Sequence, residues 1–193
     1  MSDPECIGCI HNQASGHCKI SIRDKRENFF FWDIGYIGGG FSLAPFVATP
    51  CRVVRQMLSL AEVKPGEIVF DLGSGDGRIV ILAASEFGAH AVGFELEDEL
   101  VQKSLQKIRI ANLEDQVTIV QDNMLNADLH RPDIITMYLS PTGNRELKSK
   151  LDCELKEGAR IVSLEFEIPN WTPNKIAKVL DDGLTYTLYL YHH

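Results

Sequence analysis

The chain has 193 residues, of which 45% are hydrophobic and 24% charged, and its formal net charge is −8. This length favours one well-buried domain of about 150 residues with a short appendage over two full domains. The composition excludes a disordered or fibrous protein, and the acidic charge argues against non-specific binding to nucleic acid or to an acidic membrane. A basic partner, such as a lysine-rich protein segment, remains compatible with this charge.

Residues 1–45 are predicted to form an arm rich in cysteine and aromatic side chains, ahead of a single domain over residues 46–193. The start MSDPEC has neither the basic nor the apolar segment of a secretion signal, and no run of about 18 apolar residues occurs in the chain. We therefore expect a cytoplasmic protein that does not cross a membrane.

The stretch CIGCIHNQASGHC concentrates metal-binding side chains within the arm. Three thiolates and one imidazole would complete a tetrahedral zinc site. The candidate ligands are Cys6, Cys9, His17 and Cys18, with His11 as a further imidazole. Free thiols are the alternative, because no second C-x-x-C pair follows, and an iron-sulfur cluster is a weaker third interpretation.

The predicted domain begins with a helix in TPCRVVRQMLSLA, residues 49–61. Thr49 is expected to cap this helix and Pro50 to occupy its first position. Apolar side chains recur along one stripe of the helix, so it should cover either the sheet or a ligand cleft.

From residue 66 onward, short apolar runs alternate with helical patterns. Strands are predicted over residues 67–73, 90–96, 116–121, 132–139 and 159–166. One predicted helix, residues 144–157, should end in a left-handed cap at Gly158. The alternation predicts an α/β fold: a Rossmann-like, doubly wound, mostly parallel sheet of seven strands.

The C-terminal segment does not continue this alternation of strand and helix patterns. Asp182-Gly183 is a strong tight-turn pair between two segments of alternating pattern, and it predicts an antiparallel hairpin that closes the sheet edge.

The loop DLGSGDGR follows the first predicted strand, where ligands approach an open parallel sheet most closely. Gly73, Gly75 and Gly77 remove the Cβ atoms that would hold a ligand away, and they permit positive φ. A dinucleotide fingerprint would place glycine where Arg78 stands, and a Walker-type loop would need Lys-Ser or Lys-Thr. The loop therefore indicates a ligand other than a phosphate-bearing nucleotide.

Acidic residues stand at three successive strand ends. Asp71 and Asp76 would favour the sulfonium and ammonium charges of S-adenosylmethionine (SAM), whereas they would repel a pyrophosphate. Glu95 can accept hydrogen bonds from both ribose hydroxyls, and Asp122, with Asn123 beside it, can receive the adenine amine. Taken singly, Asp122 could equally well be a strand-end cap or a solvated residue. Acidic residues at three successive strand ends, together with the glycine loop, favour SAM.

These motifs resemble the class I, seven-strand SAM-dependent methyltransferases over roughly residues 45–193. More narrowly, PFVATP, DLGSGDGRIVI, MYLSP and ARIVSLEFEIPNW resemble archaeal protein-lysine methyltransferases and their mitochondrial relatives. The resemblance implies that the methionine end of the cofactor is lined by Asp71, Gly73, Gly75 and Asp76. It also implies that Glu95 contacts the ribose and Asp122 the adenine, and that Thr49 and Pro50 lie near the cofactor. The first 30 residues depart from this family.

Tyr138, Ser140 and Pro141, in MYLSP, are the candidate residues for the acceptor side. Tyr138 offers a ring and a hydroxyl, Ser140 a polar contact and Pro141 a rigid turn. A packed Tyr138 with no substrate role is an equally good interpretation. Further candidates are Glu165, Glu167 and Trp171, since a carboxylate could hold the incoming ammonium, but a solvated strand edge is the better explanation for either glutamate.

The sequence therefore predicts an enzyme that methylates lysine side chains of proteins with SAM. A small-molecule or RNA acceptor is the first alternative, although the acidic charge makes nucleic acid a poor partner. A non-catalytic module that binds a cofactor or metal is the second alternative.

Overall fold

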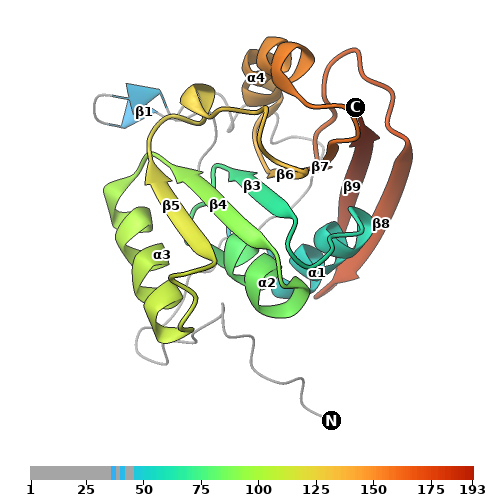
Figure 1. Cartoon of the computed structure of the whole chain (residues 1–193). Coiled ribbons are helices and arrows are strands. Elements are labelled where there is room, and N and C mark those ends of the chain that lie inside the picture. Colours follow the sequence, from blue (N-terminus) through green and yellow to red (C-terminus); the bar gives the residue numbers. More distant parts are fainter. Residues whose placement is uncertain (1–35, 38–39, 42–45) are drawn as a thin grey trace.

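The computed structural model describes residues 36–37, 40–41 and 46–193 (Figure 1). Two short strands, β1 (Tyr36–Ile37) and β2 (Gly40–Phe41), pair antiparallel ahead of the domain. The remaining elements, in chain order, are α1 (Cys51–Leu60), β3 (Ile68–Leu72), α2 (Arg78–Phe87), β4 (His90–Glu95), α3 (Asp98–Ile110), β5 (Val117–Gln121), the 3₁₀ helix η2 (Met124–Asn126), β6 (Ile134–Met137), α4 (Pro141–Glu154), β7 (Arg160–Leu164), β8 (Lys175–Asp181) and β9 (Leu184–His192).

The main sheet has seven strands in the order β5-β4-β3-β6-β7-β9-β8. The first five pair in parallel, and β9 then pairs antiparallel with both β7 and β8. The predicted fold class is confirmed, including the C-terminal hairpin. Because β4 and β6 lie on opposite sides of β3, the chain reverses direction across the sheet at β3, and ligands of such sheets bind at this point, beyond the carboxyl ends of the strands.

Helices cover both faces of the sheet (Figure 1). One buried cluster joins α1 and α2 to the sheet and includes Ile108 of α3, and a second cluster joins Leu147 and Leu151 of α4 to the opposite face. In the part of the chain that the structure describes, no helix combines the length and apolar character needed to cross a membrane.

The start of α1 differs from the prediction. Pro50, and not Thr49, is the N-cap residue, and no side chain caps this helix end. The Thr49 main-chain carbonyl instead accepts a hydrogen bond from Arg78 Nη1 at 2.7 Å. The chain is therefore anchored to the glycine loop at the point where α1 begins.

Helix α4 also differs from the prediction, because it begins and ends three residues earlier. Ser140 caps it by accepting a hydrogen bond from the Gly143 N–H at 3.1 Å, and Pro141 occupies its first turn. Gly158 has the expected positive φ of 81°, but it lies beyond the helix end at Glu154 and donates its N–H to the His193 carbonyl. It forms a turn before β7 and does not cap the helix.

Candidate active site

A pocket lies over the carboxyl ends of β3, β4, β5 and β6. Its walls come from the glycine loop, from the segments that follow β4, β5 and β6, and from the chain just before α1. Eight residues predicted to bind the cofactor line it, namely Thr49, Asp71, Gly73, Gly75, Asp76, Glu95, Asp122 and Asn123, whereas Pro50 and Gly77 are absent from its wall. The fold therefore brings together residues that lie far apart in the sequence.

Two glycines of the loop are required by close contacts as well as by backbone angles. Gly75 has φ 55°, and a Cβ placed on it would lie 2.4 Å from the ring of Phe46. Gly77 has φ 78° and precedes α2, and a Cβ there would lie 2.9 Å from the side chain of Ser104. Any larger residue at either position would displace these neighbours and strain the backbone.

Asp71 is the most deeply buried carboxylate of the pocket, with 1% of its surface exposed. Thr136 Oγ1 donates to its Oδ1 at 2.8 Å, whereas its Oδ2 has no hydrogen-bond partner within the described residues. Burial raises the pKa of Asp71 to about 8, with smaller contributions in the same direction from Glu95 and Asp76. A cationic N–H donor in the pocket would satisfy Oδ2 and favour the ionised carboxylate.

Asp76 has a different environment, because two cations already neutralise it. Arg78 donates to both carboxylate oxygens, at 2.8 and 2.6 Å, and Lys107 of α3 donates to Oδ2 at 2.6 Å. Burial opposes ionisation, but hydrogen bonds and charge from Arg78 and Lys107 outweigh it, so the pKa of Asp76 is lowered. Asp76 therefore fixes the loop more than it supplies free negative charge, and the sequence interpretation missed this role of Arg78.

Glu95 connects the ends of β3 and β4. Its Oε2 accepts a hydrogen bond from the Gly75 N–H at 2.8 Å, and its Oε1 accepts from the N–H groups of Leu96 and Glu97 at 2.8 and 2.9 Å. A carboxylate has about four lone-pair sites, so capacity remains for a ligand hydroxyl.

Asp122 and Asn123 organise the turn after β5. Asp122 is exposed, and its Oδ1 accepts from the Asn123 N–H at 2.6 Å and from Asn126 Nδ2 at 2.9 Å. The side chain of Asn123 caps η2 by accepting from the Leu125 N–H at 3.0 Å. Both side chains thus have local structural roles in addition to their place in the pocket wall.

Of the three candidates for the acceptor side, only Tyr138 lines the pocket. Ser140 and Pro141 start α4, as described above, and are absent from the pocket wall. Tyr138 is partly buried, and burial, together with the nearby Glu165 and Tyr186, raises its pKa to about 12. Its hydroxyl therefore keeps its proton at neutral pH and cannot serve as a base.

A family model described as the ANTKMT methyltransferase domain matches residues 71–175, more than half of the chain. A protein-lysine N-methyltransferase of Saccharolobus islandicus (strain REY15A) is 44% identical over 148 residues, which are 76% of this chain and 92% of that relative. The chain belongs to the ANTKMT methyltransferase domain family. It is therefore a methyltransferase, as the sequence predicted.

Two further relatives of this methyltransferase extend the comparison. The adenine nucleotide translocase lysine N-methyltransferase of Mus musculus is 38% identical over 67% of this chain, which spans 56% of that mouse protein. A crystal structure described as an RNA methyltransferase from Salinibacter ruber with S-adenosyl-L-homocysteine (SAH) is 38% identical, with a TM-score of 0.70. The matched region covers 76% of this chain and 93% of the Salinibacter ruber chain.

The pocket of this methyltransferase fits SAM by the chemistry of its donors and acceptors. Two buried oxygens on residues that line the pocket, Asp71 Oδ2 and Ser74 Oγ, have no hydrogen-bond partner within the described residues. An ammonium group carries three donors, so the amino group of the methionine moiety would satisfy such acceptors. The bare backbone at Gly75 and the spare capacity of Glu95 provide room for the rest of the ligand.

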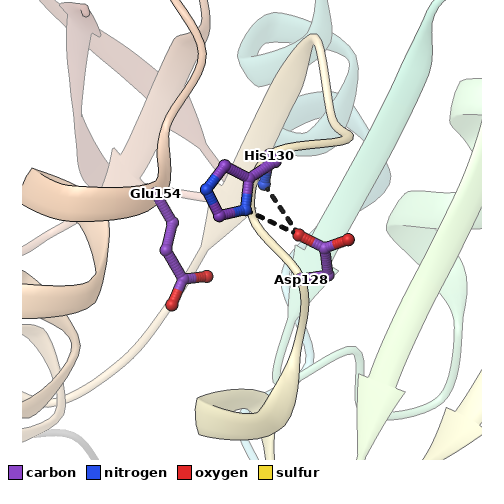
Figure 2. A group of neighbouring side chains, drawn as sticks. All are labelled: Asp128, His130 and Glu154. Atoms are coloured by element: carbon purple, nitrogen blue, oxygen red, sulfur yellow. Dashed lines mark hydrogen bonds and ion pairs between the residues drawn. The ribbon is translucent and has the colours of Figure 1, made fainter.

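The methyltransferase also carries one group of potential metal ligands among the described residues, Asp128, His130 and Glu154 (Figure 2). Each already has a partner: Asp128 Oδ1 lies 2.8 Å from His130 Nδ1, and Glu154 pairs with Lys150 at 2.7 Å. Asp128 and His130 are exposed, and none of the three lines the pocket. The predicted zinc ligands Cys6, Cys9, His17 and Cys18 lie outside the described residues.

Proposed function

We propose that this methyltransferase transfers a methyl group from SAM to lysine side chains of proteins. The observation that carries the proposal is the 44% identity to the Saccharolobus islandicus protein-lysine N-methyltransferase over 92% of that relative's length. A second relative, the mouse adenine nucleotide translocase lysine N-methyltransferase, also acts on lysine by its description. A lysine-containing protein is therefore the proposed partner.

The pocket residues are assigned by the groups they offer. Asp71 and Ser74 hold the ammonium of the methionine moiety, because both present an unsatisfied buried oxygen. Glu95 accepts from the ribose hydroxyls, and Asp122 with Asn123 bounds the adenine. Thr49 lies where α1 begins, and the positive end of that helix favours the ligand carboxylate.

Bound SAM supplies a methyl carbon on a sulfonium, so that the new N–C bond forms as the S–C bond breaks and its electron pair returns to sulfur. The protein must present a neutral amine, and for a lysine of ordinary pKa about 10.4 this costs roughly 4 to 5 kcal/mol at pH 7. The loss of hydrating water as the amine moves past the partly buried Tyr138 disfavours the ammonium and lowers that cost. Positioning beside the pocket supplies the remaining acceleration.

RNA is the alternative acceptor, because the Salinibacter ruber structure is described as an RNA methyltransferase at 38% identity. The net charge of −8 favours the protein acceptor, since RNA binding requires a basic surface that neutralises phosphates. The division into an arm (residues 1–45) and a catalytic unit (residues 46–193), the cytoplasmic location and the zinc site stay predictions from the sequence.

Transfer of labelled methyl groups from SAM into cell extract tests the proposal. The extract is separated into protein, RNA and small-molecule fractions, and the protein fraction is hydrolysed to amino acids. We expect label in methylated lysine. Label confined to RNA or to small molecules would contradict the protein-lysine acceptor while leaving the methyltransferase assignment intact.

A further inference from the structure

Glu165, the first residue after β7, has an unusual backbone. Its φ is 66°, although it is not glycine, and the Phe166 N–H donates to the Leu164 carbonyl across it at 2.9 Å. A three-residue turn with positive φ at its centre is the rare, strained form of the γ-turn. Such strain persists only where the surrounding structure imposes it, and it is concentrated at functional sites.

The surrounding structure does impose this turn. Asn144 of α4 is fully buried and donates its Nδ2 to the carbonyls of Phe166 and Glu167, both at 3.1 Å. Ser163 Oγ donates to the same Phe166 carbonyl at 2.5 Å. A buried polar network is thus devoted to the three residues that follow β7.

The network places the Glu165 carboxylate against β9. The Glu165 N–H donates to the Thr187 carbonyl at 2.8 Å, as in a regular antiparallel pair, but the Thr187 N–H donates to the side-chain Oε1 of Glu165 at 3.0 Å. The side chain therefore replaces a main-chain acceptor. This substitution holds the carboxylate beside β9 at the sheet edge that carries the pocket.

Two tyrosines lie on the strand ends next to this position. Tyr186 precedes Thr187 on β9, and Tyr138 follows β6, whose Met137 pairs with Ser163 of β7. Tyr138 and Tyr186 pack against the same buried cluster. Burial is the main cause of the raised pKa of both hydroxyls; the charge of Glu165 adds to it at Tyr138, and the charges of Asp181 and then Glu165 add to it at Tyr186.

We propose that Glu165 binds the ammonium of the acceptor lysine, with the rings of Tyr138 and Tyr186 forming the walls of this subsite. The inference rests on the proposed lysine methylation and adds the recognition of the acceptor to it. A carboxylate draws the cation in, and aromatic faces bind ammonium and methylammonium groups alike. Tyr138 belongs also to the wall of the SAM pocket, so it connects the two ligands.

In this arrangement lysine arrives as a cation and binds Glu165 at the outer part of the subsite. The ammonium then loses one proton to solvent water, and the neutral amine, with its lone pair, advances past Tyr138 towards the SAM pocket. Glu165 acts on acceptor binding, so its loss should raise the KM for the acceptor far more than it lowers kcat.

Glu165→Gln is the sharpest variant, because glutamine keeps the oxygen that accepts from Thr187 and removes only the charge. The matched control is Glu167→Gln, whose exposed side chain lies two residues further along. The probes are synthetic peptides with a single lysine and polylysine. For Glu165→Gln we expect a KM about tenfold higher, a kcat within about twofold, and an unchanged affinity for SAH. The wild-type KM should rise with salt, and that of the variant should change little.

Two results would separate the possible failures. If Glu165→Gln methylates lysine with the wild-type KM and salt dependence, the subsite is wrong and the proposed function stands. If the wild-type protein binds SAH but methylates neither the peptides nor polylysine, the proposed function fails and the subsite with it.

Inhibition of the wild-type protein tests the same proposal if Glu165→Gln does not fold. n-Butylammonium ion, which mimics the lysine side chain, should inhibit competitively against the peptide, and neutral n-butanol should inhibit at least about fivefold more weakly. Equal inhibition by the two compounds would overturn the proposal.

Discussion

The two halves of the sheet edge that carries the pocket are built differently. Around β3, β4 and β5, a glycine loop and strand-end carboxylates leave buried oxygens of Asp71 and Ser74 unsatisfied, ready for a ligand. Around β6, β7 and β9, the polar side chains of Asn144 and Ser163 are used to hold a strained turn at Glu165. The first half provides acceptors for a ligand. In the second half, the side-chain hydrogen bonds fix the position of the Glu165 carboxylate.

The two halves should therefore respond differently to substitution. Changes in the first half should alter SAM binding, and changes in the second should alter acceptor binding.

Asp71→Asn should give the largest effect. Asparagine can still accept from Thr136 but cannot provide a charged partner for an ammonium, so we expect the affinity for SAH to fall by at least about 100-fold. Calorimetric titration measures this directly, with circular dichroism to verify folding. An Asp71→Asn protein that binds SAH as tightly as wild type would remove Asp71 from the cofactor site.

Asp76→Asn should destabilise the fold. The carboxylate and its two cations are largely buried, with side-chain exposures of 10% for Asp76, 14% for Arg78 and 16% for Lys107. Loss of the charge leaves both cations without a counter-ion, which we expect to cost about 2 kcal/mol of unfolding free energy. Urea denaturation measures the loss.

The matched control for Asp76→Asn is Glu99→Gln. Glu99 lies on the same helix as Lys107 and pairs with Lys103 on the solvent-exposed surface. Glu99→Gln should leave the urea midpoint unchanged. Equal losses for the two variants would show that burial does not govern the Asp76 pairs.

Asn144→Ala tests the second half. It removes the donors for the carbonyls of Phe166 and Glu167, and we expect a loss of about 2 kcal/mol in unfolding free energy. The acceptor KM should rise because the Glu165 turn is no longer held, while the affinity for SAH should stay within about twofold of wild type. Equal loss of both affinities would mean that the two halves are not separable.

The pH dependence of stability should reveal the buried Asp71 carboxyl. Its pKa is raised from 3.8 to about 8, so between these values the folded protein without ligand holds a proton that the unfolded chain has released. The contribution of this group to stability is therefore fully present below pH 3.8 and is lost as the pH rises through about 8.

Thermal unfolding of the ligand-free protein from pH 5 to 9 measures this effect against Asp71→Asn, which lacks the titrating group. The stability of the wild type should fall relative to the variant by at least about 1 kcal/mol over this range. Parallel profiles would show that Asp71 titrates normally.

The first half could be predicted from the sequence because its signals are local. Three glycines at alternate positions and single acids at strand ends are visible in short stretches, and of these residues all but Gly77 line the pocket. Even there, the pairing of Asp76 with Lys107 was hidden, because it joins a loop to a helix 31 residues away.

The second half could be predicted only in part: Glu165 was one of three further candidates for the acceptor side, but its turn and the side chains that hold it were not predicted. MYLSP indicated an acceptor site, yet Ser140 and Pro141 start a helix, because Ser-Pro is also an N-terminal capping pair. Asn144 showed no sequence signal of its own, since its partners follow a different strand. The γ-turn at Glu165 depends on these tertiary contacts, and glutamate has no local preference for positive φ.

Calorimetric titration of the wild-type protein with SAH at pH 7, in buffers of different ionisation enthalpy, tests the central claim most directly. The account predicts binding with release of up to about one proton, because the ligand ammonium converts the protonated Asp71 into its carboxylate. Absence of SAH binding, or binding without a proton change, would contradict the account of this pocket.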